Sequence, residues 1–384
     1  MKRTLLLGLL TTWLSCTNAQ DAYVIGLSGA LTGPNAGVYA PVVEGIKLYV
    51  DHLNGKGGVN GRQIRLLIQD NSGEPSKAAA DAKRFLTQDN VIMVVNTSLS
   101  STYAPMVSET KRAGVPLLFA GAVCPKEVYP PADELQFCTT AFTPGYDTRM
   151  AFTVIKDLAK EPVRIGFAAM AIPISRAEMD YAASVAKQLN MTPVETQISP
   201  PPAPDYTPFA TKLKEANPNW IYSWSPWISE VRTFEALRRI GWEGPYVTIA
   251  HIPAEEELVR LKDPGLIVFG ANALFQDSQP GHRDIREAAK NAKLTYSVEQ
   301  MAEGWIAGLA IEQALKNSGW PPAPEKLVRS MNVLKVDLKG LRDGGIEWTK
   351  DNHFRAKQSY RVYRWDTATQ AIVRVKDWTE IGAK

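Results

Sequence analysis

The chain has 384 residues, of which 45% are hydrophobic and 22% charged. This composition is typical of a folded globular protein, and the length favours two lobes over a single core. The formal net charge is only +3, and no basic run or aromatic-basic interleaving stands out, so a nucleic acid partner is not expected.

The first residues have the pattern of a secretion signal. Lys2 and Arg3 precede an apolar or neutral run over 4–14, which is too short to cross a bilayer. The segment 17–19 then has the small-x-small pattern of a signal peptidase site. We therefore expect residues 1–19 to be a signal peptide that is cleaved after Ala19.

The three cysteines divide between this leader and the mature chain. Cys16 leaves lipidation open as an alternative, although Trp13 stands where lipoprotein sites usually carry Leu. Cleavage leaves Cys124 and Cys138, which we expect to form a disulfide because the secreted compartment is oxidising. Closing a loop of this size stabilises a fold by about 3 kcal/mol in the loop-entropy model. The Pro-containing loop between them favours the disulfide over a catalytic thiol at Cys124.

The mature chain begins with short apolar runs that alternate with amphipathic segments. This alternation predicts parallel strands joined by helices. The expected strands are 23–27, 62–68, 91–95 and 115–119. The expected helices are 42–54, 77–88 and 101–113.

A second set of the same kind follows the segment between the cysteines. Its expected helices are 147–158, 176–189, 209–216 and 229–240. Its expected strands are 163–168, a strand from 193, 220–224 and 246–249. The C-terminal part adds helices 297–316 and 324–331 and an antiparallel hairpin of 358–365 with 371–375. Two successive α/β sets predict an α/β protein with two Rossmann-like lobes.

The sequence lacks the common motifs of catalytic and metal sites. The four histidines, His52, His251, His282 and His353, do not pair at metal-binding spacing, and no Gly-x-Ser-x-Gly elbow occurs. The glycine-rich segment 55–61 follows a helix and precedes a strand, which is the reverse of a phosphate-binding loop. We expect neither an enzyme, nor a cofactor, nor a metal site.

Candidate binding residues follow the strands, because open α/β sheets bind ligands at the carboxyl ends of their strands. Five hydroxyl side chains lie in 96–102, including Ser98, Ser100 and Ser101. Hydroxyls together with the free amides of a helix N-terminus suit a carboxylate. Plain capping of the helix by Ser100 or Ser101 is the alternative.

Two further strand ends carry candidates. Gly121, Ala122 and Val123 follow the strand 115–119, and small residues let backbone amides approach a ligand, although simple turn geometry would explain them too. Trp224 and Trp227 lie at the end of the strand 220–224, where they would form the wall of a cleft. Packing in the core is the alternative for both tryptophans.

The order of these features resembles the type I periplasmic binding proteins, and most closely their leucine/isoleucine/valine-binding branch, which feeds ABC importers. The resemblance covers nearly all of the mature chain and rests on the joint order and spacing of several stretches. These are IGLSGALTGP at 25–34, GIKLY at 45–49, NGKGGVNGR at 54–62, DN at 70–71 and GVP at 114–116.

The resemblance implies two lobes that are joined by three hinge crossings and close over a small-molecule ligand. Lobe 1 would comprise 20–142 plus 273–342, and lobe 2 would comprise 143–272 plus 343–384. It also implies a periplasmic protein that is peripheral to the membrane and has ABC permease and ATPase subunits as partners. We expect this protein to be a monomer that uses no cofactor.

The resemblance also places the ligand. Ser100 and Gly121 fall where the family holds the carboxylate of an amino acid, and Tyr39 is similar to the aromatic residue of the family's first loop. Two departures matter. A second carboxylate-binding hydroxyl, a Thr in the family, falls on Val123, and the acid that pairs with the ligand's ammonium falls at Ala250 or His251.

These departures shape the expected ligand. A buried ammonium needs a paired charge, and the next acid along the chain is Glu255. We hypothesise a ligand with a carboxylate or other polar head and no ammonium, aromatic acids among the candidates, to which His251 could donate a hydrogen bond. A true amino-acid binder, a sensor component that acts through a separate protein, and an enzyme on the same fold are the alternatives.

Overall fold

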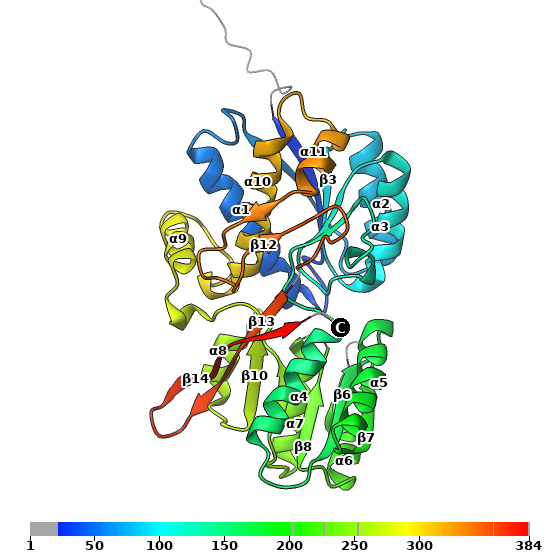
Figure 1. Ribbon diagram of the computed structural model, residues 1–384, viewed down its shortest axis with the longest axis vertical. Helices are drawn as coiled ribbons and strands as arrows, with labels where there is room; N and C mark the ends of the chain where they lie inside the picture. Colours follow the sequence, from blue (N-terminus) through cyan, green and yellow to red (C-terminus); the bar gives the residue numbers. More distant parts are fainter. Residues whose placement is uncertain (1–21, 201–202, 226, 252, 356, 383–384) are drawn as a thin grey trace, which may run out of the picture.

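The protein folds into two lobes, each built around one β-sheet (Figure 1). The computed structural model describes residues 22–200, 203–225, 227–251, 253–355 and 357–382. The expected signal peptide lies outside the described residues. In the described part of the chain, no helix has the length and apolar character that crossing a membrane requires.

Lobe 1 contains a parallel sheet of five strands in the order β2-β1-β3-β4-β5. The strands are β1 (Tyr23–Gly29), β2 (Ile64–Asp70), β3 (Met93–Thr97), β4 (Leu117–Phe119) and β5 (Gln136–Cys138). One face is covered by α1 (Ala36–Gly55) and α10 (Ala302–Ser318), and α9 (Pro280–Ala289) and α11 (Pro324–Met331) pack beside them. The other face is covered by α2 (Pro75–Thr87) and α3 (Tyr103–Ala113).

Lobe 2 contains seven strands in the order β14-β13-β10-β9-β8-β6-β7. The strands are β6 (Arg164–Met170), β7 (Thr192–Ser199), β8 (Trp220–Ser223), β9 (Tyr246–Ile249), β10 (Leu266–Gly270), β13 (Lys357–Asp366) and β14 (Ala371–Gly382). The helices are α4 (Tyr146–Leu158), α5 (Pro173–Gln188), α6 (Thr207–Glu215), α7 (Trp227–Arg239) and α8 (Ala254–Leu261). The expected C-terminal hairpin is confirmed: β13 pairs antiparallel with β10, and β14 pairs antiparallel with β13 at the edge of the sheet.

The α/β prediction is confirmed, although some bounds differ. The helix expected from Ser101 begins with a 3₁₀ turn, η1 (Ser100–Thr102), and the helix expected over 297–316 begins later, at Ala302. The sequence patterns missed several elements, namely β5, β10, α8, α9 and a two-stranded pair of β11 (Lys335–Val336) with β12 (Ile346–Glu347). Most of these are short, so that no period could be read from them.

The disulfide prediction is also confirmed. Cys124 and Cys138 are bonded, with 2.08 Å between their sulfur atoms. Because Cys138 ends β5, the bond fixes the loop between the cysteines against the edge of the sheet in lobe 1. Both cysteines are buried.

The chain passes between the lobes three times: after β5, after β10 and before β13. The expected lobe boundaries remain a proposal, and the structure suggests one change to them. β12 pairs with β11, and the buried Trp348 belongs to the core of lobe 1. We therefore propose that the third crossing lies just before β13 rather than at Asp343.

Two glycines allow α1 and α10 to lie side by side (Figure 1). A methyl group on Gly304 of α10 would overlap the carbonyl oxygen of Val42, and one on Gly45 of α1 would stand 2.7 Å from the carbonyl oxygen of Met301. Neither backbone has room to move within a packed core. The close contact of the two helices therefore depends on these two positions.

We expect Gly304→Ala to lower the free energy of unfolding by about 1–3 kcal/mol, because the added methyl group overpacks the helix contact. Denaturant unfolding measures the change. The matched control is Gly37→Ala in α1, where an added methyl group meets no atom within 4 Å. The control should gain up to about 1 kcal/mol from helix propensity. Equal effects of the two substitutions would contradict this account of the contact.

Candidate ligand-binding site

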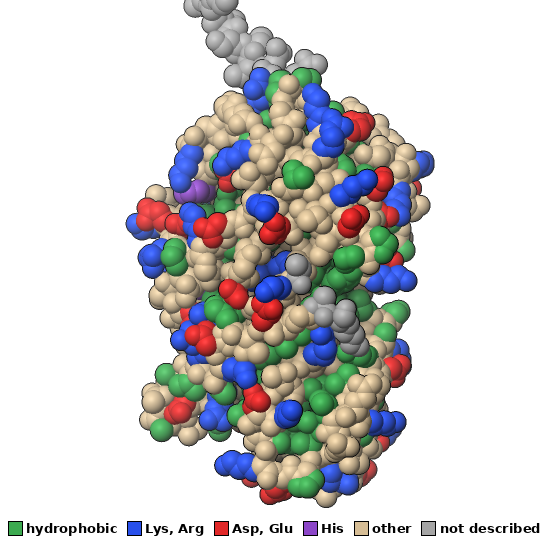
Figure 2. Space-filling view, viewed as in Figure 1, with side chains coloured by type: hydrophobic (Ala, Val, Ile, Leu, Met, Phe, Trp, Pro, Cys, Tyr) green, Lys and Arg blue, Asp and Glu red, His purple; other side chains and the backbone are tan. Residues whose placement is uncertain are grey.

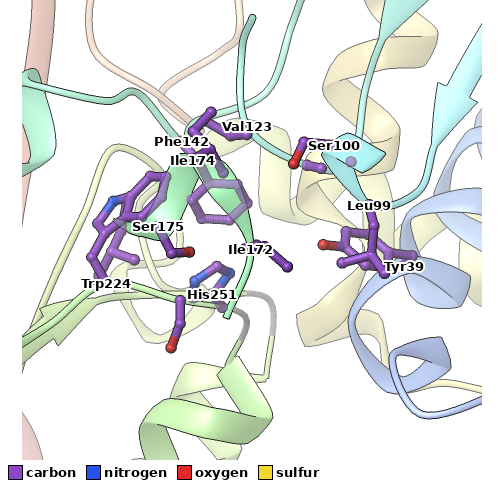
Figure 3. A pocket seen from close by; sticks show the side chains of 14 residues that line it. Tyr39, Leu99, Ser100, Val123, Phe142, Ile172, Ile174, Ser175, Trp224 and His251 are labelled. Atoms are coloured by element: carbon purple, nitrogen blue, oxygen red, sulfur yellow. The ribbon is translucent and has the colours of Figure 1, made fainter. Parts of the chain in front are cut away.

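A cavity lies between the lobes, where strands of both sheets end. Figure 3 shows Tyr39 and Ser100 of lobe 1 on one side and Trp224, Ser175 and His251 of lobe 2 on the other. The residues that line the cavity are Tyr39, Leu99, Ser100, Gly121, Ala122, Val123, Phe142, Ile172, Ile174, Ser175, Trp224, Ser225, Ile249 and His251.

The wall from lobe 1 is built by the turns after β3 and β4. The Asn96 side chain holds the first turn, since its amide donates to the Thr102 hydroxyl (2.9 Å) and its oxygen accepts from the Ser98 backbone (2.9 Å). Gly121 brings the second turn close, because a Cβ there would stand only 3.1 Å from Cα of Thr97. The two turns thus place Ser100 beside the segment after β4.

This wall offers neutral hydrogen-bond donors. Within the described residues, no hydrogen bond occupies the backbone N–H groups of Ser100, Gly121, Ala122 or Val123. The hydroxyl groups of Ser100 and Tyr39 point into the cavity in Figure 3. Burial raises the pKa of Tyr39, so its hydroxyl remains protonated at neutral pH and can donate. Such donors suit an anionic oxygen.

The middle of the cavity is apolar. Leu99, Phe142, Ile172, Ile174 and Ile249 line it. Among the described lining residues, none is Asp, Glu, Lys or Arg. A ligand in this cavity therefore meets neutral groups on every side.

Trp224 forms part of the wall from lobe 2, and Asp147 holds it there. The Trp224 indole donates to Oδ2 of Asp147 at 2.9 Å. The same carboxyl group accepts from the backbone N–H of Thr143 (2.8 Å) and from the hydroxyl of Tyr360 (2.5 Å). Burial raises the pKa of Asp147 to about 7, and these three hydrogen bonds only partly oppose the rise.

The His251 imidazole is another polar group in this wall. Its ring stacks on Phe142, with 4.4 Å between the ring centroids. Its Nε2 atom lies 3.5 Å from Oε2 of Glu230, which lies deeper in lobe 2 and is buried. Burial lowers the pKa of His251 to about 3, which the Ser225 backbone partly opposes, so the ring is neutral at physiological pH.

The structure brings together most of the residues that the sequence singled out. Tyr39, Ser100, Gly121, Ala122, Val123, Trp224 and His251 all line the cavity, and Tyr39 belongs to α1 rather than to the loop before it. Ser98, Ser101 and Trp227 do not. Ser98 donates to Oδ1 of Asn71 instead, Ser101 is exposed, and Trp227 packs 6.1 Å from the His251 ring.

Sequence reasoning missed Leu99, Phe142, Ser175, Ser225 and Ile249 as site residues. Phe142 belongs to the first crossing between the lobes, next to Thr143, where the resemblance placed a hinge. Ser175 belongs to the first turn of α5, and no pattern in the sequence distinguishes it from other serines near helix starts.

Glu255, the acid considered as a substitute, does not line this cavity. It lies in a neighbouring cavity of about 460 Å³ that shares Phe142 and His251 with the first. Its carboxylate accepts from the backbone N–H groups of Phe275 (2.6 Å) and Gln276 (3.0 Å). The described residues also contain no group of three or more His, Cys, Asp or Glu side chains that could hold a metal ion.

Comparison with known proteins places the chain among binding proteins. The sequence model of a family described as periplasmic binding protein matches residues 22–370. An amino acid binding protein of Pseudomonas aeruginosa is 34% identical over 110 residues, which is 29% of this chain and 29% of that protein. The match to this curated relative thus spans less than a third of its length.

Solved structures share the fold over nearly the whole chain. A branched chain amino acid ABC transporter structure from Thermus thermophilus with bound valine has a TM-score of 0.81 and 15% identity, and covers 94% of this chain and 97% of its own. A solute binding protein of an ABC transporter from R. palustris, in complex with 4-hydroxybenzoate, has a TM-score of 0.75 and 15% identity, with 94% and 96% covered.

The buried carboxyl of Asp147 predicts a pH dependence of stability. The pKa of Asp147 is about 7 in the folded state, above its unfolded value, so the folded protein holds this proton more tightly. The resulting contribution to the free energy of unfolding is fully present below about pH 4 and is lost as the pH rises to about 7. Relative to Asp147→Asn, the wild-type free energy of unfolding should therefore fall over this window, by up to about 1.4 kcal/mol per pH unit. Denaturant unfolding of both proteins from pH 4 to 8 measures the difference, and a constant difference would contradict the assignment.

Proposed function

Because the chain belongs to the periplasmic binding protein family, we propose that it is the solute-binding subunit of an ABC importer of the branched-chain amino acid type. In this proposal the protein captures a small carboxylic acid that lacks an ammonium group and has an apolar, aromatic body. The family assignment agrees with the expectation of a binding protein rather than an enzyme.

The observation that carries the proposal is the absence of charged side chains from the described lining of the cavity. An amino acid would bring an ammonium group into this space, where an unpaired buried charge is strongly unfavourable. Glu255 is already engaged by two backbone amides in the neighbouring cavity, and Glu230 lies behind His251. Burial raises the pKa of Glu230 well above its usual value, which disfavours the charged form that would pair with an ammonium group.

A carboxylate fits the wall from lobe 1. The Ser100 hydroxyl and the unoccupied amides of Ser100, Gly121, Ala122 and Val123 are neutral donors, and the Ser100 amide lies at the start of η1 and α3. Amides at a helix start favour a negative charge without a lysine or arginine. Hydrogen bonds from neutral donors to a carboxylate are also stronger than those to an uncharged oxygen.

The body of the ligand would occupy the apolar middle of the cavity. Phe142 and Trp224 provide aromatic faces, and Ile172 and Ile174 provide branched aliphatic groups. Aromatic rings gain from such surroundings through both area burial and offset stacking. The solved relatives show that this fold accommodates valine in one protein and 4-hydroxybenzoate in another, and the uncharged cavity of this chain favours the second class.

Function would follow from closure of the lobes. Because the ligand touches both lobes, it stabilises the closed arrangement relative to open ones, and no bond is made or broken. We propose that this closed form is recognised in the periplasm by the membrane permease, which the ATPase subunits drive, and that the binding protein is a monomer. The expected cleavage after Ala19 leaves Gln20 as the first residue, which mass spectrometry of the secreted protein can verify.

We expect benzoate to bind and leucine not to bind in calorimetric titrations of the mature protein. Ser100→Ala should weaken benzoate binding by at least about tenfold, because a hydrogen bond to a charged oxygen is lost. Ser101→Ala is the matched control, since this neighbouring hydroxyl is exposed and lies outside the cavity. Tight binding of leucine, or equal losses in both variants, would contradict the proposed function.

A further inference from the structure

The wall from lobe 2 contains polar atoms that have no partner. Ser175 is fully buried, and no described residue forms a hydrogen bond with its Oγ atom. The Nδ1 atom of His251 is also buried and has no hydrogen-bond partner among the described residues, and the His251 side chain is only 11% exposed. Both residues line the cavity. Because a buried polar atom without a partner costs about 1–3 kcal/mol, such a pair marks a place where a ligand completes the hydrogen bonds.

Figure 3 shows both residues on the side of the cavity opposite Ser100 and Tyr39. Ser175 comes from the first turn of α5, and His251 follows β9, so the two side chains converge from different elements. The His251 ring is fixed between Phe142, at 4.4 Å, and Trp227, at 6.1 Å between centroids. The Nδ1 atom thus has a defined position rather than a mobile one.

The Glu230 carboxyl lies close to this end, since its Oε2 atom is 3.5 Å from Nε2 of His251 and also has no hydrogen-bond partner among the described residues. Burial raises the pKa of Glu230 and lowers that of His251. Both shifts favour the uncharged form of the group, so this end suits an uncharged polar group of the ligand.

We propose that this end of the cavity is a subsite for an uncharged hydroxyl group of the ligand, which lies between Oγ of Ser175 and Nδ1 of His251. A hydroxyl both donates and accepts, so it completes this pair in either tautomer of the imidazole. The ligand class is then a hydroxylated carboxylic acid whose hydroxyl and carboxylate lie at opposite ends of an apolar body. This inference rests on the proposed function, which places the carboxylate at Ser100.

The test compares three ligands that differ at one position: benzoate, 4-methylbenzoate and 4-hydroxybenzoate. The methyl and hydroxyl groups are close in size, so the affinity ratio of the last two isolates the hydrogen bonds. We expect the mature wild-type protein to bind 4-hydroxybenzoate at least about tenfold more tightly than 4-methylbenzoate in calorimetric titrations.

Two substitutions test whether the ligand's hydroxyl group binds between Ser175 and His251. Ser175→Ala should bring the ratio close to one, and His251→Phe, which keeps the stacking on Phe142, should do the same. Ser184→Ala is the matched control, because Ser184 is an exposed serine on the same helix and should retain the wild-type ratio. The ratio is measured within one protein, so it does not depend on the fraction that folds.

Each result of these titrations either supports or contradicts the hydroxyl subsite. A wild-type ratio of one or less overturns the hydroxyl subsite and leaves the proposed carboxylate function standing, provided that benzoate binds. A ratio that stays at the wild-type value in both Ser175→Ala and His251→Phe places the hydroxyl elsewhere and also overturns the subsite. Failure of all three acids to bind overturns the proposed function together with the subsite.

Discussion

One buried carboxyl group connects the hinge of this protein to its cavity. Asp147 accepts hydrogen bonds from Thr143 in the first crossing, from Tyr360 in the strand after the third crossing, and from Trp224 in the cavity wall. Because a low-dielectric interior makes such hydrogen bonds mutually dependent, a change in one partner is felt by the others. Asp147 therefore joins two of the segments that cross between the lobes to the wall of the cavity.

Charged side chains lie mainly on the surface and near the crossings between the lobes, and not in the described lining of the cavity. Charged side chains of both signs are interspersed over the face of the molecule shown in Figure 2, and hydrophobic side chains gather along the boundary between the lobes. Inside, the buried Arg342–Glu303 ion pair lies near the crossings and does not line the ligand cavity. Asn272 of the second crossing also bonds to both partners. The cavity itself keeps only neutral donors and apolar surface, so its selectivity depends on which ligand groups can remain uncharged there.

The sequence predicted the fold to a large extent, because strands and helices alternate with clear periods and the strand ends indicate where a ligand binds. Ser100, Gly121 and Trp224 could be found in this way. Phe142 and Ser175 could not, because Phe142 lies in a crossing segment outside the helices and strands, and Ser175 is one of several serines near helix starts. Ser98 was chosen for its hydroxyl, yet that group belongs to the hydrogen bonds that shape the turn.

The most direct test of the account is a crystal structure of the mature protein with benzoate bound. The account predicts the carboxylate within hydrogen-bond distance of the Ser100 hydroxyl and the amides of Gly121 to Val123, with the ring between Phe142, Ile172 and Trp224. A carboxylate turned toward Ser175 and His251 of lobe 2, or a ligand bound outside this cavity, would contradict it.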